Sequence, residues 1–114
     1  MISGYINDIN GILIWNPVHG KGETVHWTGD SRNGYASGEG LMTWFHGKKE
    51  ICSYQGYMKH GKPEGFGIYK FADGDIYAGE WKAGLRHGNG KYWFRDGRFY
   101  SGPWANDKRL KRLS

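Results

Sequence analysis

The sequence contains very few of the residues that cross-link a chain or hold a metal. Of 114 residues one is a cysteine, Cys52, so a disulfide within the chain and a cysteine-rich metal site are both excluded. No apolar run of about 18 residues is present that could span a bilayer as a helix, and the N-terminus lacks the basic segment and apolar run of a signal peptide. We therefore expect a soluble, cytoplasmic protein without a metal or cofactor, free in solution or peripheral to a membrane.

A surplus of charge is nearly absent from most of the chain. The formal net charge is +5, but residues 1–107 carry 12 Lys and Arg against 11 Asp and Glu, a surplus of +1. Residues 108–114 supply the other four positive charges. A nucleic-acid-binding protein more often carries a basic stripe across its folded surface, so we expect no nucleic-acid partner.

Glycine and aromatic residues, in contrast, are abundant and recur at a fixed period. The chain has 20 glycines and is 17% aromatic, whereas disordered chains are poor in aromatic residues. Residues 54–76 and 77–99, aligned without a gap, agree at 10 of 23 positions: two Tyr, a Lys, five Gly, a Phe and an Asp. A third copy begins at Tyr100 and stops after Trp104. Such self-similarity is typical of a repeat protein.

The whole chain is interpreted as one repeat domain followed by a short tail. Gly11 to Trp15 has the spacing of the second half of a repeat, which predicts an atypical first unit. The expected units are a degenerate first repeat at 1–26, full repeats at 27–53, 54–76 and 77–99, a partial repeat at 100–104 that completes the domain 1–104, and a basic tail or cap at 105–114.

Alternation of large and small residues predicts that each unit is a pair of antiparallel β-strands. The fold class is therefore all-β: one elongated, twisted antiparallel sheet of successive β-hairpins, with roughly eight to ten strands. The pairs Asp73-Gly74 and Asp96-Gly97 predict tight hairpin turns. Residues 83–87 are expected to form a longer loop, and the extra residues 48–53 a longer or bulged connection.

Position counting places rings and glycines on one face of this sheet. Rings from neighbouring hairpins can lie over glycine backbone there, which would build a core without a second layer. The alternative is an exposed stacking platform for a sugar or a single-stranded nucleic acid, but a regular ladder of rings favours the core. The ladder consists of Tyr54, Tyr69, Phe71, Tyr77, Trp81, Tyr92, Phe94, Tyr100 and Trp104.

The stretch from Tyr77 to Gly97 has the pattern Tyr-x-Gly-x-Trp-x-x-Gly-x-x-x-Gly-x-Gly-x-Tyr-x-Phe-x-Asp-Gly. This pattern resembles a MORN (membrane occupation and recognition nexus) repeat. The resemblance is close over 54–104, moderate over 27–53 and weak over 1–26. It implies an elongated, twisted row of hairpins without enclosed catalytic machinery. It also implies a scaffold, a dimerisation module or a module that associates with membranes or phosphoinositides.

The face opposite the ring ladder breaks the repeat pattern with apolar residues. Large exposed apolar patches usually mark interaction sites, so this face predicts a site for a protein partner or a second copy of the chain. The expected partner-binding residues are Leu41, Tyr57, Phe66, Ile68 and Trp93. Alternatively, the N-terminal segment, whose Ile12 and Ile14 are assigned to this same face, covers or extends it.

The basic tail suggests a second kind of partner. Lys108, Arg109, Lys111 and Arg112 could meet an anionic lipid surface, together with basic residues of the expected loops such as Lys59, Lys62 and Arg86. Alternatively, the tail is a marginal helical turn, a frayed end or a cap in which Leu110 covers the last hairpin.

Catalysis has little support in the sequence. The five histidines fall at different repeat positions, and none forms a pair with helical metal-ligand spacing. We therefore expect a non-enzymatic module, with protein binding or self-association as its function. Membrane or phosphoinositide binding is the alternative, and carbohydrate or peptide binding in the groove of the sheet is a weaker one.

Overall fold

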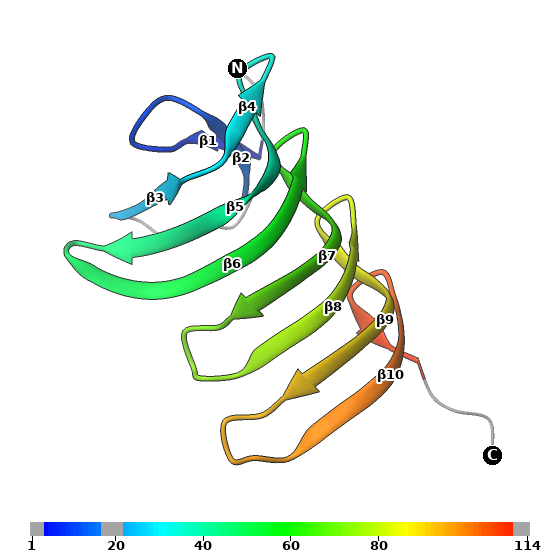
Figure 1. The fold of residues 1–114 in the computed structure, drawn as a ribbon. Helices are drawn as coiled ribbons and strands as arrows, with labels where there is room; N and C mark the ends of the chain where they lie inside the picture. Colours follow the sequence, from blue (N-terminus) through cyan, green and yellow to red (C-terminus); the bar gives the residue numbers. More distant parts are fainter. Residues whose placement is uncertain (1–3, 17–21, 111–114) are drawn as a thin grey trace.

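The computed structural model describes residues 4–16 and 22–110, and these form one sheet without a helix (Figure 1). Its strands are β1 (Tyr5–Asn7), β2 (Leu13–Trp15), β3 (Glu23–Trp27), β4 (Asp30–Arg32), β5 (Tyr35–His46), β6 (Lys49–Lys59), β7 (Lys62–Lys70), β8 (Ile76–Lys82), β9 (Leu85–Trp93), β10 (Phe99–Ala105) and β11 (Lys108–Arg109). From β5 to β11 each strand pairs antiparallel with the next. β3 and β4 both pair with β5, as two parts of one interrupted strand. The molecule measures 48 × 28 × 23 Å. The expected all-β row of hairpins is confirmed.

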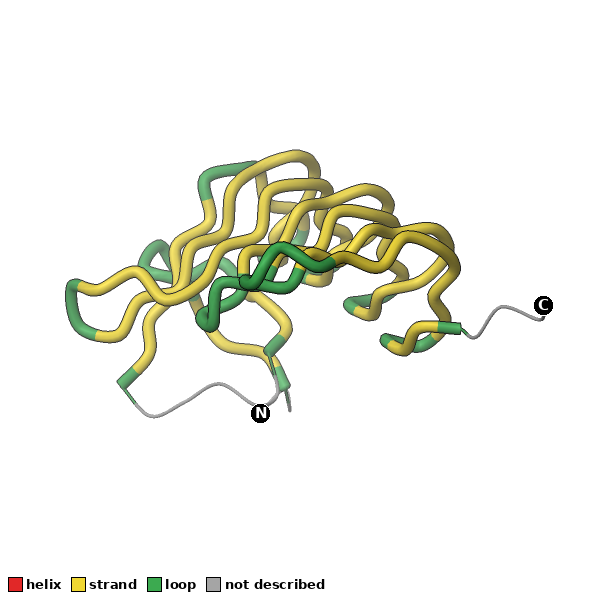
Figure 2. Tube along the Cα trace, turned by 90° about the horizontal axis from the view of Figure 1, so that it is seen from below, coloured by secondary structure: helices red, strands yellow, loops and turns green. Residues whose placement is uncertain are grey.

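The sheet is a single layer that arches, with the N-terminal elements beneath one end (Figure 2). We call the face beneath the arch the inner face and the other the outer face. The inner face carries the core, in which Tyr54 and Tyr77 are fully buried and Trp81 and Trp104 nearly so. Neighbouring rings meet edge to face: the ring centroids of Tyr77 lie 5.2 Å from Trp81 and 5.1 Å from Trp104. The ring ladder is thus largely core, and the sheet needs no covering layer.

A row of glycines crosses the sheet beside these rings. The strand registers place Gly40, Gly56, Gly67, Gly79, Gly90 and Gly102 opposite one another in turn. A Cβ at Gly67 would overlap the ring of Tyr54, and one at Gly90 the ring of Tyr77. Each tyrosine therefore lies over bare backbone, and its burial depends on these glycines.

The hydroxyl of each of these tyrosines also donates a hydrogen bond to a backbone carbonyl of its own strand. Tyr54 donates to the carbonyl of Tyr57 at 2.8 Å, and Tyr77 to the carbonyl of Glu80 at 2.8 Å. Tyr57 and Glu80 are the residues at which the pairing of β6 with β7 and of β8 with β9 shifts register. A bulge leaves a residue out of the ladder. The hydroxyl therefore bonds the carbonyl of the bulged residue.

The turn assignment made from the sequence is wrong in one respect. Ala83-Gly84 is the tight turn, with φ of 50° and 86°, and β9 begins directly after it. Asp73-Gly74, in contrast, lies in a five-residue connection between β7 and β8. Its loop is closed by a bond from the Phe71 amide to the Asp75 carbonyl at 2.9 Å. Tertiary contacts explain Ala83, because its amide donates to the Glu64 carboxylate at 2.9 Å and the amide of Gly84 to the Pro63 carbonyl.

Of the extra residues 48–53, those from Lys49 onward form strand rather than loop. β5 and β6 are 12 and 11 residues long, and their register shifts between Trp44 and Phe45. The bulge was expected, but the long connection was not found. The insertion lengthens this hairpin, because residues Lys49 onward continue the pairing with β5.

The N-terminal strands do not repeat the hairpin arrangement of the rest. β1 and β2 form a small antiparallel hairpin, and β2 meets β5 in parallel through Leu13 and Tyr35. The turn of this hairpin covers the free edge of β3. There the carboxylate of Asp8 accepts hydrogen bonds from the amides of Asn10, Ile12 and Trp27 at 2.8 to 3.1 Å, and it is buried. A free strand edge invites pairing with another chain, and Asp8 closes this one.

Candidate functional site

The outer face carries an apolar strip across β5 to β10. Phe66 is 61% exposed, Tyr57 40% and Leu41 39%, while Ile68 and Trp93 are half-buried. Leu41 and Ile68 both lie opposite Gln55, on its two neighbouring strands, and so share one row. The five residues expected from the sequence therefore lie on one face.

Three further residues belong to this strip. Ile76 pairs with Trp93, which pairs with Phe99, and Ala78 pairs with Ile68. Phe99 is 59% exposed. A shallow hollow of about 510 Å³ lies among Ile68, Ile76, Ala78 and Trp93. We call the following set the outer strip: Leu41, Tyr57, Phe66, Ile68, Ile76, Ala78, Trp93 and Phe99. Alternation within each strand would have identified the added three, since each stands directly next to an inner-face tyrosine.

Cations border the C-terminal end of the outer strip. The ammonium of Lys91 lies 4.3 Å from the ring centroid of Phe99 and 4.9 Å from that of Trp93. Lys70 and Arg95 line the hollow. This arrangement, apolar in the middle and charged around it, resembles the core and rim of a protein interface.

Residues 4–16, the described part of the N-terminal segment, do not lie over the outer strip, which corrects the assignment of Ile12 and Ile14 to the outer face. Ile14 is fully buried in the core cluster of the inner face, and Ile12 packs against that cluster. Trp15 lines an inner-face cavity with Met42, Trp44, Tyr69 and Trp81. The physical reason is backbone pairing: the amides of Leu13 and Trp15 donate to the carbonyls of Gly34 and Gly61, each at 2.8 Å. These bonds hold β2 beneath the arch.

Beyond β10 the chain folds back as a hairpin, and residues 105–110, the described part of the tail, contain no helical turn. Asn106 and Asp107 both adopt positive φ, which these residue types tolerate, and β11 pairs with β10. Lys108 and Arg109 therefore belong to the sheet, whereas Lys111 and Arg112 lie outside the described residues. Leu110 is 43% exposed.

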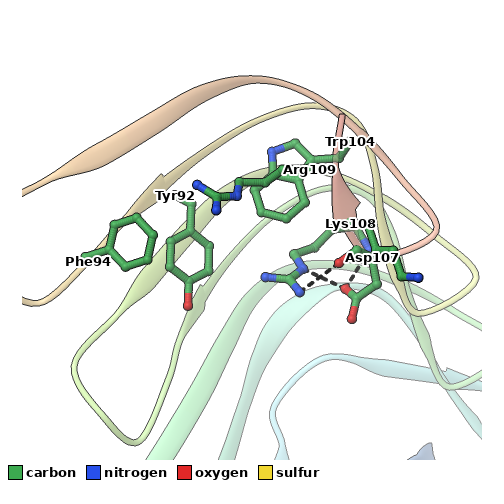
Figure 3. A pocket seen from close by; sticks show the side chains of 7 residues that line it. Tyr92, Phe94, Trp104, Asp107, Lys108 and Arg109 are labelled. Atoms are coloured by element: carbon green, nitrogen blue, oxygen red, sulfur yellow. Dashed lines mark hydrogen bonds and ion pairs between the residues drawn. The ribbon is translucent and has the colours of Figure 1, made fainter. Parts of the chain in front are cut away.

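β11 closes a pocket on the inner face (Figure 3). We call it the C-terminal pocket; it has a volume of about 310 Å³ and is lined by Arg86, Tyr92, Phe94, Trp104, Asp107, Lys108 and Arg109. Arg86 is fixed there, since its Nε lies 2.6 Å from Asp107 Oδ1 and its Nη2 donates to the Asp107 carbonyl at 3.0 Å. Its guanidinium lies 4.7 Å from the ring centroid of Trp104.

The two arginines of this pocket differ in what balances their charge. Asp107 neutralises Arg86, whereas no carboxylate of the described residues lies within ion-pair distance of Arg109. The guanidinium of Arg109 lies 5.3 Å from the ring centroid of Tyr100 and 5.9 Å from that of Phe94. With Lys108, the pocket carries three cations against one anion.

Tyrosine hydroxyls of the inner face are held in the protonated state. Burial raises the pKa of Tyr77 to about 12. Burial, followed by the hydrogen bond to Asp75, raises the pKa of Tyr92 to about 12. Burial also raises the pKa of Tyr54 and Tyr69. The hydroxyls of Tyr54, Tyr77 and Tyr92 act as hydrogen-bond donors that support the fold.

No catalytic arrangement stands out in the described part of the chain. Cys52 lies in β6, 3.4 Å from the Tyr69 hydroxyl, and burial raises the pKa of its thiol, which disfavours the reactive thiolate. Residues 4–16 and 22–110 contain no group of three or more His, Cys, Asp and Glu side chains suited to a metal. Nor does any helix able to cross a membrane occur among them.

These features define a class: an open, single-layer sheet of β-hairpin repeats that offers surfaces rather than an enclosed active site. The family model for the MORN repeat matches residues 27–48, 54–76 and 77–97, more than half of the chain. The chain belongs to the MORN repeat family. These repeats are a non-enzymatic module that generally serves in interaction with proteins or membranes. No curated protein matches the chain.

Proposed function

We propose that this chain is a non-catalytic binding module whose outer strip docks a protein, either a partner or a second copy of the chain. The observation that carries the proposal is the exposure of Phe66 at the centre of the strip, flanked by Tyr57 and Ile68. Full burial of such a ring is worth about 1.5–3 kcal/mol. A partner that covers the strip would recover this free energy, and no described segment of the chain does so.

The outer strip also has the composition that favours binding over packing within the fold. Three of its aromatic residues stand where another unit of the repeat has a polar residue: Glu80 is the equivalent of Tyr57, Asn89 of Phe66 and Lys70 of Trp93. Aromatic residues are enriched at the energetic centres of interfaces. The fold does not need these rings, because its core is on the inner face.

The test is a double variant, Tyr57→Ser with Phe66→Ser, compared with Lys49→Ser plus Lys59→Ser as a control of exposed residues at the two ends of β6, outside the strip. Light scattering over a concentration series measures self-association, and affinity capture from lysate followed by mass spectrometry detects a partner. We expect the double variant to keep its circular dichroism spectrum and lose association, and the control to keep both. Unfolding of the double variant would show that the strip is core. Unchanged association would exclude the strip as the docking surface.

A membrane or phosphoinositide surface is the second candidate. It is supported by Lys108 and Arg109, which lie side by side in β11 at the end of the sheet. Co-sedimentation with phosphatidylserine vesicles compares the native chain with a Lys108→Ala, Lys111→Ala and Arg112→Ala variant, which leaves β10 and β11 in place. Salt-sensitive binding that the variant loses would support lipid binding. Equal binding of both forms would exclude a role for these cations.

A further inference from the structure

Among residues 4–16 and 22–110, the N-terminal segment covers only the first half of the inner face. Strand β2 runs along a row of tight turns there. Leu13 donates to the carbonyl of Gly34 and Trp15 to that of Gly61, the second residues of two successive turns. The side chain of Trp15 lies on the aromatic surface, with the ammonium of Lys62 4.3 Å from its ring centroid. The structure thus shows how this face holds an extended segment.

The row of turns continues beyond the end of β2. The next two turns are Ala83-Gly84 and Asn106-Asp107. Gly84 and Asp107 are their second residues, as Gly34 and Gly61 are in the first two turns. The turns are also bonded to one another in the same way, since the amide of Gly84 donates to the carbonyl of Pro63 and that of Asp107 to the carbonyl of Arg86. Among residues 4–16 and 22–110, no amide donates to the Gly84 carbonyl as the Trp15 amide does to Gly61.

The character of the inner face changes where the cover ends. The residues two places after Gly34 and Gly61 are Ala36 and Pro63. The residues two places after Gly84 and Asp107 are instead arginines, Arg86 and Arg109. Ala36 is fully buried, in the same core cluster as Ile14. The first half is therefore apolar and occupied as far as Gly84, beside which the Trp15 side chain lies, whereas the C-terminal pocket beyond it is cationic and lined by Tyr92, Phe94 and Trp104.

We propose that the C-terminal pocket binds an extended acidic segment of a partner protein, laid along the row of turns as β2 is. In this arrangement an amide of the segment donates to the Gly84 carbonyl, and an apolar side chain packs on the partly buried rings of Tyr92 and Phe94. A carboxylate of the segment meets the guanidinium of Arg109, whose charge no described carboxylate balances. Charge-assisted bonds of this kind are among the strongest that side chains make.

An extended peptide fits this pocket better than a compact ligand. The pocket volume of about 310 Å³ is at the lower end for small-molecule pockets, which start at about 300 Å³. The Gly84 carbonyl continues the series of backbone acceptors, Gly34 and Gly61, that β2 uses, which favours recognition of a peptide main chain. In that mode of binding, backbone hydrogen bonds provide affinity and side-chain pockets provide specificity. Arg86, held by Asp107, supplies a rigid wall, and Arg109 supplies the selectivity for acidic residues.

The proposal is independent of the outer strip and is tested on the full chain. The probes are two fluorescein-labelled peptides, one alternating Glu with Trp and Leu and one with Lys in place of Glu, measured by fluorescence anisotropy at low and high salt. We expect salt-sensitive binding of the acidic peptide alone. Arg109→Glu should weaken it at least about tenfold, as for a lost charge-assisted bond. Arg32→Glu, the same change of charge at an exposed site on β4, should leave it unchanged.

Further variants distinguish loss of peptide binding at the C-terminal pocket from misfolding and from binding at the outer strip. If Arg109→Glu lowers the thermal midpoint, Arg109→Gln replaces it, with a smaller loss of affinity expected. Phe66→Ser should bind the acidic peptide as the native chain does, so that failure of one surface does not imply failure of the other. The Trp104 indole signal in NMR spectra should shift on binding.

Three outcomes overturn the proposal. They are equal affinity of the Arg109→Glu and Arg32→Glu variants, equal binding of the Lys and Glu peptides, and no binding of the acidic peptide up to about 1 mM. Loss of phosphatidylserine vesicle binding in Arg109→Glu, without any peptide binding, would assign this cation to a lipid surface instead.

Discussion

The hydroxyl of Tyr77 donates a hydrogen bond to the backbone carbonyl of Glu80, three residues further along the same strand, at 2.8 Å. Glu80 lies at the bulge where the pairing of β8 with β9 shifts. Tyr54 and Tyr57 are related in the same way at 2.8 Å, and Tyr100 bonds the carbonyl of Pro103 at 3.0 Å. One side chain thus fills the core and satisfies the irregular backbone of its own repeat.

Removing that hydroxyl should therefore destabilise the fold. We expect Tyr77→Phe to lower the free energy of unfolding by about 1 kcal/mol, since the ring stays and a partly buried carbonyl loses its donor. Tyr57→Phe, at an exposed ring, should change it by less than about 0.5 kcal/mol. Urea unfolding of both variants measures the difference, and equal values would argue against a structural role for the bond.

Glycines under the rings should not tolerate a methyl group. Gly90→Ala should cost about 1–3 kcal/mol, because its Cβ would overlap the Tyr77 ring and force the ring or the strand to move. Asn89→Ala, at the exposed neighbour on β9, is the matched control and should be nearly neutral. A Gly90→Ala variant as stable as the native chain would show that the ring does not need the bare backbone.

Stability should fall at alkaline pH because of the tyrosines. The pKa of Tyr77 and Tyr92 is raised from 10.0 to about 12 in the folded chain, so the folded state keeps these protons longer than the unfolded state. Their contribution is fully present below about pH 10 and is lost as the pH rises toward about 12. Urea unfolding across this range measures it. Tyr92→Phe should show a shallower decline, and a flat profile for the native chain would contradict the effect.

Asp8 should matter for both stability and association. Its carboxylate accepts hydrogen bonds from three backbone amides and closes the free edge of β3. Asp8→Ala should lower the free energy of unfolding by at least about 2 kcal/mol, because buried amides lose a charged acceptor. It should also promote edge-to-edge association, visible by light scattering. The control is Asp30→Ala, at an exposed residue of β4, and if the two variants behave alike, Asp8 does not close the edge.

Much of the architecture could be predicted because it is periodic. Rings and glycines at alternate positions identify the strands, their pairing and the face that holds Tyr77 and Trp81. The turns were harder, because Asp-Gly is a strong local signal and Ala-Gly is a weak one. The structure places the tight turn at Ala83-Gly84, where bonds to Glu64 and Pro63 of the preceding hairpin outweigh the cost of positive φ at alanine.

Of the two candidate surfaces, the outer strip could be predicted from the sequence and the C-terminal pocket could not. The outer residues Tyr57, Phe66 and Ile68 could be named from the sequence, since each interrupts a polar position of the repeat. Ile76 and Phe99 could have been found by extending the same alternation. The C-terminal pocket could not, because it depends on β11 folding back and on Asp107 reaching Arg86.

The repeat by itself determined the class of fold, the position of the core and the absence of any need for a second layer. Each hairpin contains its own ring, its glycines and its carbonyl acceptor, and these contacts are local. Only the tertiary structure decided what the two ends of the sheet do. The N-terminal hairpin covers half of the inner face, and β11 closes a cationic pocket on the other half. Both placements depend on backbone bonds between segments far apart in the chain, which no periodic pattern encodes.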